Sequence, residues 1–274
     1  MASEKYERLL AILRELPGVA VAFSGGVDSV LLARAAKDAL GDRALLVTAD
    51  SETYPAGELA EARKLAALIG LRHVVVRTEE LANPEYARNG ANRCFFCKDE
   101  LFTRLAPIAA REGIGTLAYG ANVDDLGDHR PGMKAAAERG VRAPLIEAGL
   151  TKQEIRDVSR ALGLPTWDKP SFACLSSRFQ YGDAITAEKL RRIDAAEEFV
   201  RSLGFRQFRV RHHDRLARLE IPLEDVPRLW QDGRHEAILA RFRELGYVYV
   251  TVDLGGFQSG SANLLLGLKR RVDG

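Results

Sequence analysis

The chain has 274 residues, which at roughly 100 to 200 residues per domain favours one large domain or two modest ones with a proper hydrophobic core. Its composition, 46% hydrophobic and 28% charged, excludes a fibrous or disordered protein. Forty Lys and Arg against 38 Asp and Glu give a formal net charge of +2, so overall charge does not indicate a polyanionic partner and any basic site must be local.

The N-terminal segment, MASEKYERLLAILREL, mixes charged and apolar side chains, which predicts an amphipathic helix rather than a signal peptide. The longest apolar runs, such as residues 18–23, are the size of a strand and far from the roughly 18 apolar residues of a membrane span. We therefore expect a cytoplasmic protein with no membrane partner. Three cysteines, partly spaced as C-x-x-C, indicate metal or redox chemistry in a reducing compartment rather than a structural disulfide.

Short apolar segments alternate with helical patterns over the first 164 residues. The apolar segments lack polar alternation, as strands buried on both faces do; they are residues 18–23, 43–49, 72–78 and 115–120. Helices are predicted between them over 30–40, 56–69 and 98–110, and a further one over 152–162. Thr151 and Glu154 form a capping box for the last of these. This order predicts an α/β fold with a parallel, doubly wound sheet.

The second part of the chain predicts a smaller α+β domain. Residues 164–185 contain two prolines and show no periodicity, which is typical of a crossover between domains. After it we expect a helix from Thr186 to about residue 203, strands at 205–212 and 215–221, helices at 223–230 and 235–245, and a strand at 247–254. The predicted domains are 1–164 and 186–274, joined by the crossover 165–185.

A glycine-rich segment, Ser24-Gly-Gly-Val-Asp-Ser29, follows the first predicted strand and opens the next helix. Backbone N–H groups and a helix N-terminus converge there, an arrangement that binds phosphate. The glycines allow positive φ, the serines supply hydroxyl donors, and the Asp28 carboxylate suits Mg²⁺. The chain has no Walker or dinucleotide-binding glycine motif, and a turn that serves only geometry is the weaker interpretation.

The segment SGGVDS resembles the pyrophosphatase loop (PP-loop) of the adenine nucleotide α-hydrolase superfamily, whose Rossmann-like domains cleave ATP between the α and β phosphates. The resemblance implies ATP and Mg²⁺ as cofactors. Two further groups of polar residues end predicted strands at the same carboxyl edge of the sheet, where ligands of open α/β sheets lie, although a solvated acidic turn is the alternative for the second group. The ATP-binding candidates are Ser24, Gly25, Gly26, Val27, Asp28 and Ser29, then Asp50, and then Gly120, Asn122, Asp124 and Asp125.

Cys174 lies in the predicted crossover, close to two serines and Arg178, which favour a thiolate. A buried apolar cysteine is the alternative interpretation. An adenylated carbonyl needs a nucleophile, and the chain contains no glutaminase domain that would deliver ammonia. Sulfur from Cys174 is therefore a candidate nucleophile.

Three stretches, residues 92–102, 120–136 and 173–186, together resemble the LarE family of ATP-dependent sacrificial sulfur transferases, and the likeness spans the whole chain. The resemblance implies adenylation of the carboxylates of pyridinium-3,5-biscarboxylic acid mononucleotide and their conversion to thiocarboxylates, with release of AMP and pyrophosphate. The product is a precursor of the nickel-pincer cofactor of lactate racemase. The resemblance further implies that Cys174 is the sulfur donor and that the protein is a homo-oligomer.

Cys94 and Cys97 distinguish this chain from the single-cysteine form of that family. Together with Cys174 they suit three irons of a 4Fe-4S cluster whose fourth iron stays open for a sulfide. With such a cluster, Cys174 would keep its sulfur atom during the reaction. The alternatives are a zinc site that lacks one ligand, or a relay of persulfide and disulfide between cysteines. The cysteine spacing favours a cluster over consumption of Cys174, because three cysteine ligands leave one coordination position of the cluster open.

Arg209 and Arg211 alternate with apolar residues, so they should share one face of a strand. Six arginines and a single acid lie between residues 201 and 218, and Arg binds phosphate and carboxylate bidentately. A solvated face paired to acids elsewhere is the alternative. The LarE resemblance implies that the substrate mononucleotide binds to Ser177, Arg178, Glu197, Arg209 and Arg211.

Two rival functions differ from this reading. A transfer-RNA thiolase would use the same activation on a nucleobase, but it needs a broad basic surface, so we do not expect a nucleic-acid partner. A nucleotide-binding sensor would hold ATP and a cluster without turnover. Pyrophosphate release that depends on a small carboxylate substrate separates an enzyme from such a sensor.

Overall fold

The computed structural model describes residues 2–127, 130–170 and 173–258. It divides the chain into two compact units: unit 1 contains residues 1–86 and 92–172, and unit 2 contains residues 87–91 and 173–274. The domain boundaries predicted from the sequence stay a prediction. No helix among the described residues is long and apolar enough to cross a membrane.

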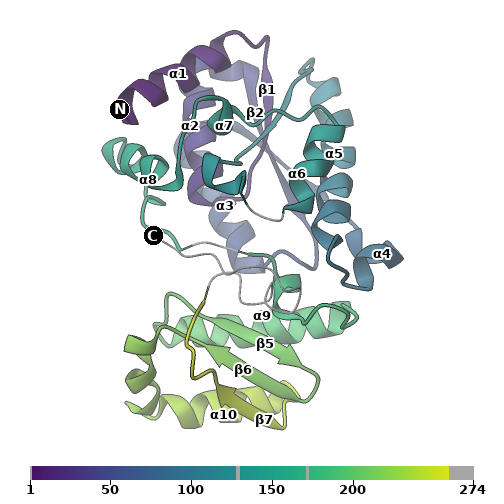
Figure 1. Ribbon diagram of the computed structural model, residues 1–274, viewed down its shortest axis with the longest axis vertical. Helices are drawn as coiled ribbons and strands as arrows, with labels where there is room; N and C mark the ends of the chain where they lie inside the picture. Colours follow the sequence, from purple (N-terminus) through teal and green to yellow (C-terminus); the bar gives the residue numbers. More distant parts are fainter. Residues whose placement is uncertain (1, 128–129, 171–172, 259–274) are drawn as a thin grey trace. The chain divides into compact units, whose positions relative to one another are not determined.

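Unit 1 contains a four-stranded sheet of order β3-β2-β1-β4, in which all neighbouring strands are parallel (Figure 1). Its strands are β1 (Val19–Ala22), β2 (Ala44–Asp50), β3 (Arg72–Arg77) and β4 (Leu117–Tyr119). Each of them coincides with a predicted strand, although β2 extends one residue beyond the predicted range 43–49. The prediction of an α/β fold with a parallel sheet is therefore confirmed.

Helices cover both faces of this sheet. On one face Val21 and Leu46 pack with α1 (Ala2–Arg14), α2 (Val27–Leu40), α3 (Ala56–Ile69) and α8 (Lys152–Ala161). On the other face Leu45 and Val47 pack with α5 (Arg93–Arg111) and α6 (Pro131–Glu138). Burial on both faces explains why these strands lack polar alternation.

Shorter helices complete unit 1, and the sequence analysis did not predict them. They are η1 (Gly41–Arg43), η2 (Glu80–Ala82), α4 (Pro84–Ala87, which ends in unit 2), η3 (Val123–Asp125) and α7 (Pro144–Glu147). Helix α5 begins at Arg93, earlier than the predicted residue 98, so both Cys94 and Cys97 lie within its first two turns. The capping box of Thr151 and Glu154 on α8 is confirmed.

Unit 2 contains a three-stranded sheet of order β5-β6-β7, with an antiparallel β5–β6 pair and a parallel β6–β7 pair. Its elements are η4 (Leu175–Arg178), α9 (Ala187–Ser202), β5 (Arg209–His213), β6 (Leu216–Glu220), η5 (Leu223–Trp230), α10 (Arg234–Glu244) and β7 (Tyr249–Val252). The segment 223–230 is a 3-10 helix. A separate core packs α9 and α10 on the sheet through Val200, Val210 and Phe242.

Candidate active site residues in two units

The glycine-rich loop connects the C-terminal end of β1 to α2. Gly25 has φ +67°, a left-handed conformation, and a Cβ there would contact Ala62 at 3.4 Å. Gly26 is the N-cap of α2 and has no side chain to cap the helix. The first backbone N–H groups of α2 therefore donate to no capping side chain. The Ser29 hydroxyl instead donates to the Gly26 carbonyl at 3.0 Å and lies 3.2 Å from the Ser24 hydroxyl. This geometry suits an anion at the loop.

The end of β4 approaches the loop closely because Gly120 has no side chain. A Cβ at Gly120 would lie 2.9 Å from the backbone nitrogen of Ser29 and 3.1 Å from the carbonyl carbon of Asp28. Two residues later, Asn122 Nδ2 donates to Asp28 Oδ1 at 3.2 Å. The structure therefore brings Gly120 and Asn122 to the glycine-rich loop.

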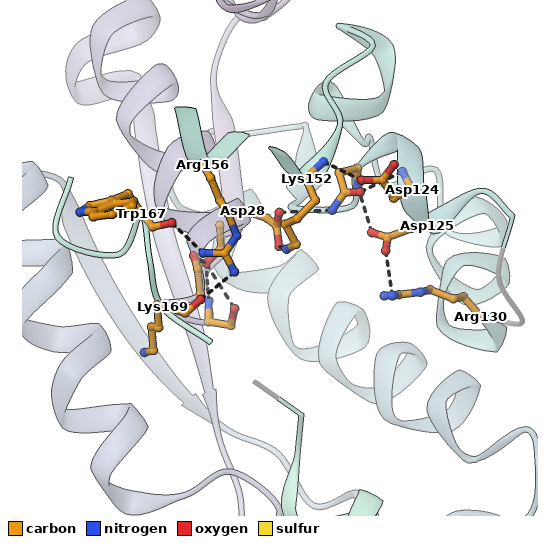
Figure 2. Close-up of polar contacts among 12 residues, drawn as sticks. Asp28, Asp124, Asp125, Arg130, Lys152, Arg156, Trp167 and Lys169 are labelled. Atoms are coloured by element: carbon orange, nitrogen blue, oxygen red, sulfur yellow. Dashed lines mark hydrogen bonds and ion pairs between the residues drawn. The ribbon is translucent and has the colours of Figure 1, made fainter. Parts of the chain in front are cut away.

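Lys152, at the start of α8, is a site residue that sequence reasoning missed. Its ammonium donates to Asp28 Oδ2, and its backbone N–H donates to Asp124 Oδ2 at 2.7 Å (Figure 2). It thus connects two of the predicted acidic residues. No sequence motif points to Lys152, because its role depends on where α8 packs in the fold.

The other acidic candidates in unit 1 have different surroundings. Asp125 is buried, accepts from the Asn122 N–H in the capping box of η3, and pairs with Arg130 at 2.8 Å, so its carboxylate holds the turn together (Figure 2). Asp50 is exposed at the end of β2. Because parallel strands end at one edge of the sheet, Asp50 lies at the same edge as the glycine-rich loop.

Asp28 is the residue of this group best suited to Mg²⁺. Within the described residues no group of three His, Cys, Asp or Glu side chains forms a metal site. Magnesium commonly takes only one or two protein carboxylates and completes its shell with phosphates and water, and the Asp28 carboxylate fits that role.

Cys174 occupies the N-cap position of η4 in unit 2, where its side chain makes no capping hydrogen bond, and it is partly exposed. Arg178, at the other end of η4, donates to the carbonyls of Ala173 at 2.6 Å and Cys174 at 3.1 Å and to the Ser177 hydroxyl at 2.9 Å. Burial lowers the pKa of Arg178, but its pairing with Glu197 and, less strongly, its attraction to Cys174 raise the pKa overall. The cysteine is therefore held by backbone contacts beside a permanent positive charge.

Glu197 and Glu220 each bind one arginine of the predicted substrate site in a two-pronged ion pair. Arg178 donates to both oxygens of Glu197 at 2.8 Å, and Arg211 donates to both oxygens of Glu220 at 2.9 Å. The four side chains are at most 5% exposed, so the alternative of a solvated strand face does not hold for Arg211, although its pairing with an acid is present. Arg211 also donates to the Ser177 carbonyl, which connects it to the cysteine segment.

Arg209 differs from these two arginines because no ion pair with a carboxylate is seen for it among the described residues. Arg209 is 7% exposed, and its guanidinium lies 4.9 Å from the ring centroid of Phe257. Burial, and then repulsion from Arg211 and Arg178, lowers its pKa to about 10. Three arginines against two glutamates leave this buried group with one excess positive charge, which suits an anion.

Cys94 and Cys97 are three positions apart in the first two turns of α5 and therefore lie on one side of the helix. Cys94 is exposed, and the guanidinium of Arg93 lies 4.0 Å from its sulfur. Such a pair suits two corners of a metal cluster, but Cys174 belongs to the other unit. The described residues contain no complete three-ligand group, so the cluster is unsupported by the structure.

No family model matches the chain. The chain is 47% identical to an uncharacterized protein, slr1717, of Synechocystis, over 97% of this chain and 99% of the relative. It is 36% identical to the pyridinium-3,5-bisthiocarboxylic acid mononucleotide synthase of Lactiplantibacillus plantarum, over 94% of each chain. A glutamine-hydrolysing GMP synthase of Aeropyrum pernix is 30% identical over 73% of this chain and 42% of its own length.

Proposed function

The chain belongs to the LarE family of pyridinium-3,5-bisthiocarboxylic acid mononucleotide synthases, and from this premise we propose that it converts carboxylates of a pyridinium dicarboxylate mononucleotide to thiocarboxylates at the expense of ATP. The likeness to GMP synthase supports a PP-loop fold and the use of ATP. The observation that carries the proposal is the similarity of 36% over 94% of both chains, which covers the glycine-rich loop and Cys174 alike.

The residues of unit 1 support the adenylation step. A substrate carboxylate oxygen attacks the α phosphate of ATP, the bond to the β phosphate breaks, and pyrophosphate leaves. Uncapped N–H groups at the start of α2 and the left-handed Gly25 suit the developing charge on that pyrophosphate. Mg²⁺ held at Asp28 would neutralise phosphate charge, and Lys152 fixes the Asp28 carboxylate in place.

The residues of unit 2 support substrate binding and sulfur transfer. Arg209 carries the excess positive charge of the buried arginine group and is our candidate for the substrate's phosphate or second carboxylate. The Cys174 thiolate attacks the acyl adenylate, AMP leaves, and a thioester forms. A base then removes the α hydrogen of Cys174, the Cβ–S bond breaks, and the products are a thiocarboxylate and a dehydroalanine at position 174.

A 4Fe-4S cluster on Cys94, Cys97 and Cys174 is the alternative source of sulfur. It would supply a sulfide on its open iron and leave Cys174 intact. The location of Cys94 and Cys97 on one side of α5 supports a shared metal, whereas the sacrificial route needs Cys174 alone. The two routes differ in iron content and in protein mass.

The first experiment uses protein purified without oxygen and incubated with ATP, Mg²⁺ and the pyridinium dicarboxylate. Thiolated product with a protein mass lower by about 34 Da indicates that Cys174 is consumed, because that is the mass of the hydrogen sulfide lost. Four irons per chain and an unchanged mass indicate the cluster. A Cys174→Ala protein with full sulfur transfer contradicts both routes.

A second experiment separates the proposed enzyme from its rivals. We expect pyrophosphate release to require the dicarboxylate, and a Cys94→Ala/Cys97→Ala protein to keep a single turnover under the sacrificial route. ATP binding without pyrophosphate release would indicate a sensor. Salt-sensitive binding of transfer RNA would indicate a thiolase.

A further inference from the structure

Two side chains outside the glycine-rich loop bind its backbone carbonyls. The Tyr54 hydroxyl, from the segment between β2 and α3, donates to the Ser24 carbonyl at 2.7 Å. The Lys169 ammonium donates to the Gly25 carbonyl at 3.3 Å. Neither residue belongs to the loop motif, and no sequence pattern predicts either contact.

These contacts fix the direction of successive peptide groups. A peptide is planar and trans, so its N–H points away from its C=O. With the Ser24 carbonyl directed at Tyr54, the N–H of Gly25 points away from Tyr54, and with the Gly25 carbonyl directed at Lys169, the N–H of Gly26 points away from Lys169. The Gly26 carbonyl is held as well, because it accepts from Ser29 and from the Val30 N–H.

Lys169 is itself held in a defined position. Its ammonium pairs with Glu58 at 2.7 Å and Glu61 at 2.9 Å, both on α3, and its side chain is 14% exposed. Its backbone carbonyl accepts from Arg156 at 2.9 Å, and the same guanidinium donates to the Trp167 carbonyl at 2.7 Å (Figure 2). With two carboxylates beside it, this ammonium is already neutralised and serves the loop as a hydrogen-bond donor.

We propose that Tyr54 and Lys169 are positioning residues that orient the N–H groups of the glycine-rich loop toward the pyrophosphate portion of ATP. This inference rests on the proposed function, since it takes ATP as the loop's ligand. Donors fixed before the ligand arrives cost no reorganisation on binding. Loss of either contact allows the peptide groups to rotate, which weakens the binding of phosphate but leaves the binding of adenosine unaffected.

The test titrates inorganic pyrophosphate and adenosine separately into the full-length parent protein and its variants. For Tyr54→Phe, which changes no charge, we expect pyrophosphate affinity to fall about tenfold, the effect of one lost hydrogen bond of about 1.4 kcal/mol, with unchanged adenosine affinity and melting temperature. Tyr249→Phe, on an exposed tyrosine of β7, is the matched control. Equal pyrophosphate affinity in Tyr54→Phe and parent overturns the proposal, as does an equal loss for adenosine.

Lys169→Met needs a further variant, because it also leaves the Glu58 and Glu61 carboxylates without their shared partner. Lys169→Met/Glu58→Gln restores the net charge of this group to the parent's single negative charge. We expect the loss of pyrophosphate affinity to persist in this double variant, whereas Lys169→Arg recovers part of it. Full recovery in the double variant assigns the effect to charge and contradicts the role of Lys169. A parent protein that binds neither pyrophosphate nor ATP contradicts the proposed function itself.

Discussion

The three buried arginines of unit 2 have the same chemistry but different partners. Arg178 and Arg211 each form a two-pronged ion pair with a buried glutamate, whereas Arg209 contacts an aromatic ring. Removal of one partner from a buried ion pair leaves an uncompensated charge. The arginines should therefore differ sharply in what they contribute to stability and to binding.

We expect Arg209→Met to keep or raise the free energy of unfolding, since it removes the unpaired charge, and to weaken substrate binding at least tenfold. Arg178→Met should lower the free energy of unfolding by about 3 to 5 kcal/mol, because Glu197 loses its ion pair. Urea unfolding and substrate titration measure the two effects. Comparable destabilisation by both variants would show that Arg209 is a structural residue.

His212 predicts a pH dependence of stability. It is 1% exposed, its Nδ1 lies 3.1 Å from the Tyr247 hydroxyl, and burial, followed by repulsion from Lys189 and Arg192, lowers its pKa to about 4. Its unfolded pKa is about 6.5, so the unfolded chain binds more protons between these values. The contribution of His212 to the free energy of unfolding is nearly complete above about pH 7 and falls by roughly 3 kcal/mol as the pH drops to 4.

Urea unfolding of the parent and of His212→Gln at several pH values checks this dependence. The parent should lose more stability than the variant between pH 6.5 and 4. His213, whose pKa burial also lowers, remains in both proteins and serves as a common background. Identical pH slopes would mean that His212 does not account for the dependence.

At the level of elements, hydrophobic pattern predicted the parallel sheet well, since every strand of unit 1 lies in an apolar run between glycines, prolines or charges. It missed α6 and α7, because residues 120–150 are rich in glycine, proline and charge and show no clear period. Motif resemblance gave both Asp28 and Asn122 as ATP-binding candidates, and in the structure their side chains are hydrogen-bonded. It gave no sign of Lys152, Tyr54 or Lys169, whose contacts join segments far apart in the sequence.

The approach of β4 to the start of α2 yields a prediction at this level. Gly120→Ala would put a Cβ 2.9 Å from the Ser29 nitrogen, so we expect the two elements to separate, ATP affinity to fall more than tenfold, and stability to fall by about 1 to 3 kcal/mol. Gly115→Ala is the matched control, because nothing lies within 4 Å of a Cβ at that position. ATP titration and thermal melting of both variants check this expectation.

At the level of the whole molecule, separate cores predict separate responses to ligand. The two cores of unit 1 and the core of unit 2 share no residues. Saturation with ATP at about 100 times its Kd stabilises the folded state of its binding unit by about 2.7 kcal/mol. We therefore expect bound ATP to slow amide hydrogen exchange across the core strands of unit 1 and not in β5 and β6. Equal slowing in β5 and β6 would show that the two units unfold together.

Residues 87–91 belong to unit 2, although the chain on both sides of them belongs to unit 1. The Ala87 carbonyl accepts from the Ile185 N–H and the Asn89 carbonyl from the Gly182 N–H, so this short insertion completes the segment that follows Cys174. Neither unit is therefore a continuous piece of sequence. Recombination between two relatives at a single point near residue 172 would combine residues 87–91 of one relative with the rest of unit 2 from the other, so an exchange of unit 2 must include both segments.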